Sequence, residues 1–364
     1  MKTQKRWLVS ILLLALLVGS VSCAAPTEEP EPEEAFKVAF VYVGPVGDLG
    51  WSYAHDQGRQ ALEELPYVEV TYSETVAEGP DAERVIRTYA EDGYDMIFAT
   101  SFGYMDSVLQ VAEEFPDIYF EHCTGYKTAE NVSIYDGRGY EGWYLAGITA
   151  GRMTESNIIG YVAPYPIPEV VRNLNAFTQG ARSVNPDVEM HPVWIFNWFD
   201  PPAEREAAQA LLEVGADVIA RESDSPEPDK LAEENGAYAI AYNAVSPDIA
   251  PDAVLTAPVW DWGAYYKETV EAAYKGEWET HSYWGHIADG LMDLAPFGDM
   301  VPQEVQDEVN AAKEQIISGE LHPFAGPISD SNGELRVEED AVMSDEEMLS
   351  FNWLVEGVVG EIPE

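Results

Sequence analysis

Apolar and polar positions alternate along the chain in two recurring patterns. Short and nearly continuous apolar runs, such as residues 36–43 (FKVAFVYV), are typical of strands that are buried on both faces. Longer stretches place apolar residues three or four positions apart, as with Ala82 and Ile86 in residues 81–92, and this spacing predicts amphipathic helices. The two patterns follow one another in turn. Strands that alternate with helices build parallel sheets covered on both faces.

This alternation runs through the chain twice. The expected strands are residues 36–43, 68–72, 95–100, 118–122 and 132–135, then 158–163, 188–196, 217–220, 238–241 and 254–258. The expected helices are residues 53–65, 81–92, 104–115 and 141–153, then 168–184, 201–214, 228–235 and 262–274, with one more at 302–318. We therefore expect an α/β fold of two Rossmann-like lobes joined by a hinge. The carboxyl ends of their parallel strands should face a common ligand cleft.

The repeat also sets the expected domain boundaries. The first lobe is expected over residues 36–155, together with part of the C-terminal segment, and the second lobe over residues 156–260. Residues 261–364 should supply a crossover helix and the C-terminal segments that complete both lobes.

The first 35 residues have a different character. Three basic residues precede an apolar run at residues 8–18, which is too short to span a bilayer comfortably and predicts a signal peptide over residues 1–22. The run ends at Cys23 in a sequence that resembles a bacterial lipobox, so we expect Cys23 to carry lipid; ordinary signal cleavage nearby is the alternative. Residues 23–35, rich in Pro and Glu, would then form an acidic tether. These features predict an exported protein that is lipid-anchored at the extracytoplasmic face of the membrane.

Acidic residues far outnumber basic ones. The chain has 66 Asp and Glu against 19 Lys and Arg in 364 residues, a formal net charge of −47. Such a charge repels phosphate backbones and anionic lipid, which argues against nucleic-acid binding and against membrane docking through a basic patch. It also favours a neutral ligand over a phosphorylated one. Hydrophobic residues still make up 46% of the chain, enough for a packed core.

The sequence offers little support for catalysis. It contains no Walker A, G-x-S-x-G or H-E-x-x-H motif, and its six histidines lack metal-ligand spacing. Residues 137–142 read G-x-G-x-x-G between an expected strand and helix, but the ribose-binding acid of a dinucleotide site is absent around residues 160–163. The pair His122-Cys123 points to opposite faces of a strand, which favours a structural cysteine. We therefore expect no enzyme, no cofactor and no metal.

Aromatic and acidic residues gather where the expected strands end. Clusters follow two strands in each half, so they should face one another across the cleft. Opposed aromatic faces suit a flat ring, and carboxylates suit the N–H groups at its edge; a sugar would also stack on tryptophan. The candidate ligand-binding residues are Asp48, Trp51, Phe102, Tyr104, Asp106, Trp198, Phe199, Asp224, Trp260 and Asp261.

Several separate stretches resemble one known family in the right order. They are GDLGW (47–51), TSFGYMD (100–106), YEGWYLAG (140–147), GARSVNPD (180–187), WFDP (198–201) and HPFAGP (322–327). Together they resemble the basic membrane protein family, the substrate-binding lipoproteins of ABC importers for purine nucleosides and bases. The resemblance implies the type I periplasmic-binding-protein fold, a purine base or nucleoside as ligand, and an ABC permease and ATPase as partners. It implies binding without catalysis.

The resemblance also suggests which kind of purine is bound. It implies that one aromatic from each lobe sandwiches the base, with Trp51 in the first lobe and Trp198 or Phe199 in the second. Nucleoside-binding members often carry an Asp where this chain has Val43-Gly44, and a Lys where it has Trp260. We therefore expect a free, adenine-like base to be favoured over a nucleoside. A sugar or autoinducer-type receptor on the same fold, and an exported sensor without transport, are the alternatives.

Overall fold

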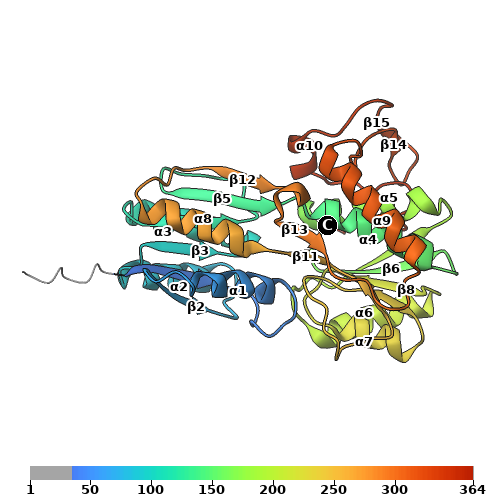
Figure 1. Cartoon of the computed structure of the whole chain (residues 1–364), viewed down its shortest axis with the longest axis horizontal. Helices are drawn as coiled ribbons and strands as arrows, with labels where there is room; N and C mark the ends of the chain where they lie inside the picture. The colour runs from blue at the N-terminus through green and yellow to red at the C-terminus, as the bar shows by residue number, and fades with distance from the viewer. Residues whose placement is uncertain (1–34, 364) are drawn as a thin grey trace, which may run out of the picture. The chain divides into compact units, whose positions relative to one another are not determined.

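Two parallel sheets organise the chain, and alternating residues of their strands face helices on opposite sides. In the computed structural model, which describes residues 35–363, β1 (Phe36–Val41) turns Val38 and Phe40 towards one helical layer and Ala39 and Val41 towards the other. This period of two is what a strand covered on both faces requires. The expected fold class is confirmed (Figure 1).

The first sheet has the strand order β12-β5-β4-β3-β1-β2, and all neighbouring strands are parallel. The strands that join β1 are β2 (Val68–Ser73), β3 (Met96–Ala99), β4 (Tyr119–Cys123), β5 (Val132–Gly137) and β12 (Ser282–Gly285). The helices of this lobe are α1 (Trp51–Leu62), α2 (Pro80–Glu91), α3 (Met105–Glu114) and α8 (Trp262–Tyr274), with the short 3₁₀ helix η1 (Phe102–Tyr104). Helix α1 packs against α8 on one face, and α2 against α3 on the other.

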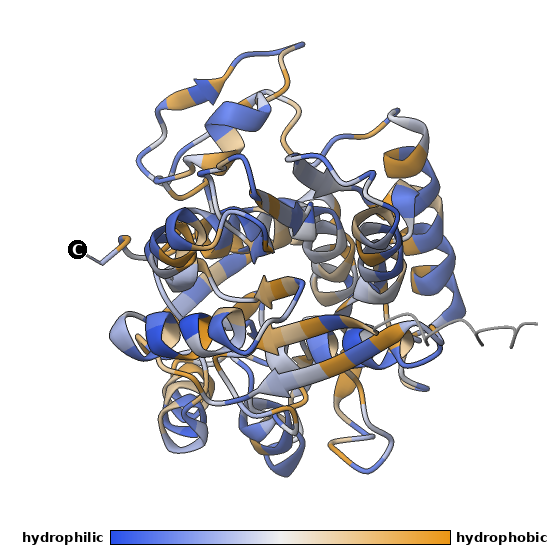
Figure 2. Cartoon of the chain, turned by 90° about the vertical axis from the view of Figure 1, so that its left-hand side faces the viewer, coloured by the Kyte–Doolittle hydropathy of each residue, from blue (hydrophilic) through white to orange (hydrophobic). Residues whose placement is uncertain are grey.

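The second sheet has the order β10-β9-β8-β6-β7 and is also parallel. Its strands are β6 (Ile158–Ala163), β7 (Glu189–Trp194), β8 (Val218–Arg221), β9 (Tyr238–Ile240) and β10 (Val254–Thr256). Its helices are α4 (Gly139–Met153), α5 (Pro168–Val184), α6 (Pro201–Glu213), α7 (Glu227–Glu234) and α9 (Gln303–Ser318). Hydrophilic and hydrophobic residues alternate along the helices that Figure 2 shows, as amphipathic layers require.

Helix α4 packs against α5 and α9, so it belongs with the second sheet. The expected lobe boundary after residue 155 is therefore too late, because the chain leaves the first sheet after β5 and enters the second lobe with α4. The G-x-G-x-x-G stretch lies at this passage, and packing explains its glycines. A Cβ atom on Gly137 would lie 2.1 Å from the Trp260 ring, and one on Gly142 would lie 2.7 Å from the sulfur of Met292.

The chain crosses between the lobes twice more. The strand expected at residues 254–258 is in fact two strands, β10 in the second sheet and β11 (Pro258–Trp260), which pairs antiparallel with β13 (Met292–Leu294). From β11 the chain enters α8 of the first lobe, and from β13 it returns to α9 of the second. The segment after α9 contains β14 (Ile328–Ser329), β15 (Leu335–Val337) and α10 (Asp345–Leu349), and η2 (Ile287–Asp289) precedes β13.

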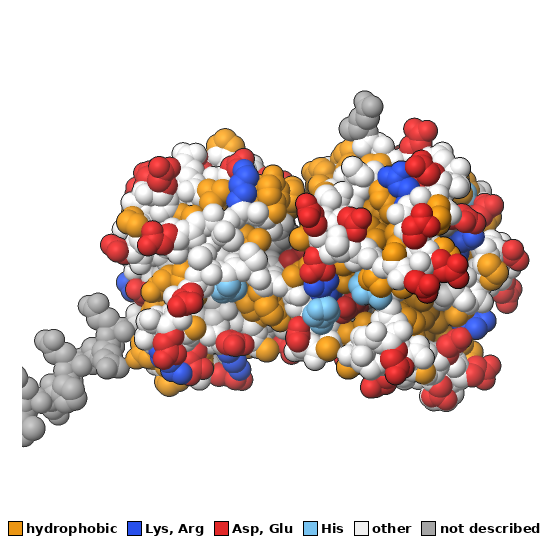
Figure 3. All heavy atoms as spheres, turned by 90° about the horizontal axis from the view of Figure 1, so that it is seen from above, with side chains coloured by type: hydrophobic (Ala, Val, Ile, Leu, Met, Phe, Trp, Pro, Cys, Tyr) orange, Lys and Arg blue, Asp and Glu red, His pale blue; other side chains and the backbone are white. Residues whose placement is uncertain are grey.

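Acidic side chains are spread over both lobes on the face that Figure 3 shows, with few basic ones between them. Within residues 35–363, no helix has the length and apolar character needed to cross a membrane. The expected signal peptide, Cys23 and most of the tether lie outside the described residues.

Candidate ligand-binding cleft

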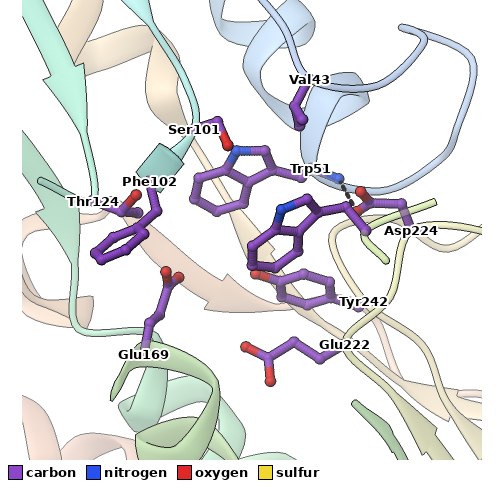
Figure 4. A pocket seen from close by; sticks show the side chains of 10 residues that line it. Val43, Trp51, Ser101, Phe102, Thr124, Glu169, Glu222, Asp224 and Tyr242 are labelled. Atoms are coloured by element: carbon purple, nitrogen blue, oxygen red, sulfur yellow. Dashed lines mark hydrogen bonds between the residues drawn. The ribbon is translucent and has the colours of Figure 1, made fainter. Parts of the chain in front are cut away.

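A pocket lies where the carboxyl ends of both sheets meet, and each lobe supplies five of its lining residues (Figure 4). The space that protein atoms leave free there, including the part open to solvent, is about 380 Å³. The lining residues follow β1, β3 and β4 in the first lobe and β6, β7, β8 and β9 in the second. They are Val43, Trp51, Ser101, Phe102 and Thr124, then Glu169, Trp198, Glu222, Asp224 and Tyr242.

Trp51 is held firmly at the start of α1. Its ring Nε1 donates a hydrogen bond of 2.6 Å to the carbonyl oxygen of Thr100. Its ring also meets Trp260 and Trp262 edge to face, with centroids 6.1 and 5.8 Å away. A large aromatic surface fixed in this way loses little conformational entropy when a ligand stacks on it.

Asp48 shapes the loop that carries Trp51. Its two carboxylate oxygens accept the backbone N–H groups of Gly50 (2.8 Å), Ser52 (3.2 Å) and Tyr53 (3.0 Å), which caps the first turn of α1. Burial raises the pKa of this carboxyl to about 6, although the backbone hydrogen bonds act to lower it. Asp48 does not line the pocket and acts through Trp51.

Four of the ten predicted site residues line the pocket: Trp51, Phe102, Trp198 and Asp224. Two of the others have structural partners in the first lobe. Tyr104 is buried, and its hydroxyl donates to the carbonyl of Val76 at 2.6 Å. Asp106 is exposed and pairs with Lys127 at 3.0 Å.

The remaining predicted residues lie around the pocket rather than in its lining. The Trp260 ring stacks on Trp262, with centroids 4.9 Å apart and planes 20° apart. Asp261 caps α8 by accepting the backbone N–H of Gly263 at 3.1 Å. Phe199 is half-buried, and its backbone N–H donates to the side chain of Asn197. Five predicted residues therefore do not line the pocket and instead make packing, pairing or capping contacts. They are Tyr104, Asp106, Phe199, Trp260 and Asp261.

Six lining residues were missing from the predicted site. They are Val43, Ser101, Thr124, Glu169, Glu222 and Tyr242. All follow the carboxyl end of a strand, and that position could have identified them. The prediction instead selected aromatic and Asp residues by type, and it passed over the glutamates.

The pocket is lined by three acidic side chains, Glu169, Glu222 and Asp224. Glu222 is buried and accepts hydrogen bonds from the Tyr161 hydroxyl (2.5 Å) and the Asn173 amide (2.7 Å). Burial raises its pKa to about 8, so it holds a proton at neutral pH. Burial also raises the pKa of Glu169, and the charges of the nearby Asp136 and Glu222 add to this effect.

Asp224 joins the two lobes across the pocket. Its Oδ1 atom accepts the backbone N–H of Trp51 at 2.7 Å, as the dashed line in Figure 4 marks. Its Oδ2 atom is buried and has no hydrogen-bond partner in the described chain. Burial, followed by the charge of Asp48, raises the pKa of Asp224 well above its usual range. The two lobes are therefore in direct hydrogen-bonded contact beside the pocket.

The lining of the pocket carries acidic groups and no basic ones. None of its ten lining residues, all in the described chain, is basic. Across residues 35–363, no three His, Cys, Asp or Glu side chains are grouped so that they could hold a metal ion. Cys123 is buried, as expected for a structural cysteine. The ring of the neighbouring His122 is hydrogen-bonded to the carbonyl oxygen of Ser101 at 2.8 Å.

Comparisons with known proteins agree with this geometry. A purine-binding protein of Brucella abortus is 43% identical over 91% of this chain and 95% of its own length. A Haloferax volcanii protein named as the glucose-binding protein of an ABC transporter is 46% identical over 92% of this chain and 83% of its own. A solute-binding protein of an ABC transporter from Aeropyrum pernix shares the fold at a TM-score of 0.68, with 18% identity over 88% of this chain and all of that one.

The match to a family model extends over both lobes. The model for PnrA-like substrate-binding proteins of ABC transporters covers residues 35–322, which include both sheets and all ten lining residues. Proteins of this kind bind small molecules and deliver them to a permease. The fold, the cleft between the lobes and this match lead to one assignment: the chain belongs to the Bmp family of ABC transporter substrate-binding proteins.

Proposed function

We propose that this substrate-binding protein captures a purine base, adenine-like rather than a nucleoside, and delivers it to an ABC permease. The observation that carries the proposal is the lining of the pocket. Trp51 and Trp198 enter it from opposite lobes, with Phe102 and Tyr242 beside them, so a flat ring can be enclosed by aromatic surface. The Brucella relative named for purine binding supports the same ligand class.

The polar groups of the pocket favour a base over its phosphorylated or glycosylated forms. The lining contains three acidic residues and no basic one, which disfavours a phosphate. Val43 and Trp260 stand where nucleoside-binding members of the family often carry polar groups, which also supports a free base.

Glucose is the second candidate, and a specific observation favours it. The pocket combines tryptophan faces with three carboxyl groups and the hydroxyls of Ser101 and Thr124, a set that can also accept and donate hydrogen bonds to a sugar. The Haloferax relative is named for glucose. We prefer a purine because four aromatic residues line the pocket, and a flat aromatic ring can stack on them with its whole surface.

Delivery would follow from closure of the lobes. We expect the ligand to bind one lobe first and the hinge then to close, so that the Trp51–Asp224 hydrogen bond forms and the permease meets the closed shape. Lipidation at Cys23 and the acidic tether would keep the protein at the extracytoplasmic face of the membrane, next to the permease and its ATPase.

Mass spectrometry of small molecules released by denaturing the purified full-length protein tests this function without assuming the ligand. The proposal predicts a purine base at up to one equivalent. Glucose at the same stoichiometry, with no purine, would overturn it in favour of the second candidate. If the purified protein carries no ligand, it would be refolded and incubated with an equimolar mixture of adenine, adenosine and glucose. The same measurement would then identify which of the three is retained.

A further inference from the structure

Glu169 differs from the other acidic groups near the pocket. It lies in the first turn of α5, and Figure 4 shows its carboxyl pointing into the space bounded by Trp51, Phe102 and Tyr242. The side chain accepts no hydrogen bond from any group in the described chain and is only partly shielded from solvent. A pocket carboxyl without a protein partner leaves both of its oxygens available to solvent or to a bound ligand.

The neighbouring acids are already engaged. Glu222 receives hydrogen bonds on both oxygens, from Asn173 and Tyr161. Asp136 accepts the backbone N–H of Gly137 at 2.7 Å and lies 3.7 Å from the guanidinium of Arg172. Within residues 35–363, Glu169 is thus the pocket carboxyl with both oxygens open, while Asp224 has one.

The surroundings of Glu169 also determine its protonation. Burial raises its pKa well above the usual range, and the charges of Asp136 and Glu222 raise it further, while the charge of Arg172 opposes them. These influences favour the protonated form of the carboxyl. A protonated carboxyl presents an O–H donor and a C=O acceptor side by side.

This pair of groups matches one feature of a purine base. Purine bases carry edges on which a ring nitrogen acceptor lies next to an N–H donor, and such an edge can form two parallel hydrogen bonds with a carboxylic acid. A hexose can reach both oxygens of a carboxyl only through two adjacent hydroxyls, which do not lie in one plane with the carboxyl as a base edge does. We propose, building on the purine-binding function above, that Glu169 is the specificity residue of the cleft and pairs with an adjacent N and N–H on the bound base.

The proposal makes different predictions for two substitutions. Glu169→Gln keeps one donor and one acceptor in the same plane, so adenine affinity should stay within about threefold of wild type. Glu169→Ala removes both groups and leaves the base edge unpaired, so affinity should fall by about 10- to 100-fold. Glu206→Gln on the exposed surface of α6 is the matched control and should leave binding unchanged.

Calorimetric titration of these full-length proteins with three ligands provides the test. 9-Methyladenine and N6,N6-dimethyladenine each remove the donor from different edges of adenine. At least one of them should bind the wild type more weakly than adenine does, and that ligand should be insensitive to Glu169→Ala. Melting curves of the empty variants check folding, and the Gln variant keeps the test intact if the Ala variant does not fold.

The two proposals fail in different ways. If the wild type binds adenine and Glu169→Ala binds it equally well, the role of Glu169 is wrong and purine binding stands. The role of Glu169 is also wrong if both methylated bases bind the wild type as tightly as adenine. If the wild type binds glucose and no purine base, both proposals are overturned.

Discussion

A methyl group at Gly50 should prevent the lobes from closing. Gly50 precedes α1 in the first lobe and lies directly against Asp224 of the second. A Cβ atom at this position would lie 2.3 Å from Oδ1 of Asp224 and 2.6 Å from its Cα. Because the second atom belongs to the backbone, a change of side-chain rotamer cannot relieve the contact.

The geometry sets the size of the effect. Asp224 would have to retreat by about 1 Å before its Cα reached an ordinary contact distance from the new methyl group. A retreat of this size breaks the 2.7 Å hydrogen bond from the Trp51 N–H to Asp224. Hydrogen bonds to charged or strongly polar partners contribute about 1.5–3 kcal/mol. Loss of this bond from the closed form should therefore weaken ligand binding by about 10- to 100-fold.

Titration calorimetry measures the affinity, and small-angle scattering with and without saturating ligand measures closure. Gly47→Ala is the matched control, since it adds the same methyl group to the same loop where no atom lies within 4 Å. The control should bind and close like the wild type. If Gly50→Ala binds as tightly as Gly47→Ala and becomes equally compact with ligand, the contact between Gly50 and Asp224 does not govern closure.

Four further substitutions address stacking, protonation and stability. Trp51→Ala and Trp198→Ala should each weaken adenine binding by at least about tenfold in calorimetry, because each removes one stacking surface; unchanged affinity would rule out the sandwich. Glu222 has its pKa raised to about 8, above its unfolded value, so the free energy of unfolding should fall as pH rises from about 4 to 8. Urea unfolding of Glu222→Gln should show a shallower fall, and an identical slope would refute this assignment. Asp229→Ala leaves the buried Arg221 without its partner at 2.8 Å. The free energy of unfolding measured in urea should therefore fall by about 3–5 kcal/mol. A fall below about 1 kcal/mol would contradict a buried ion pair.

The sequence pattern predicts most of the regular structure because both faces of these sheets are buried. Continuous apolar strands such as β1 and amphipathic helices such as α8 carry a local signal, and the expected helix over residues 262–274 matches α8. The short strands β12, β13, β14 and β15 carry no such signal. They have two to four residues each, and their pairing depends on partners far away in the sequence, as when β12 joins β5.

The candidate site is predicted in part, for a related reason. Trp51 and Trp198 stand out by residue type at the ends of strands, and both line the pocket. Trp260 is also a tryptophan at the end of a strand, yet it does not line the pocket. Its ring stacks on Trp262 and contacts the lining residue Trp51 edge to face. Glu169 lies in the first turn of a helix, where an acidic residue ordinarily stabilises the helix dipole, so the sequence does not distinguish a pocket carboxyl from a surface one.

The assignment of α4 to the second lobe could not be read from the local pattern either. The helix is apolar on nearly all sides, so either sheet could have covered it. Its glycines allow α4 to pack closely against α5 of the second lobe. A Cβ atom on Gly147 would lie 2.2 Å from the backbone of Phe177 in α5. Contacts of this kind appear only in the folded chain.

Titration of adenine and of glucose into ligand-free, full-length protein tests the central claim most directly. Purine-base binding predicts a saturable 1:1 isotherm for adenine with a dissociation constant at or below the micromolar range, and no detectable heat of binding for glucose at the same concentrations. A saturable isotherm for glucose, with none for adenine, would contradict it.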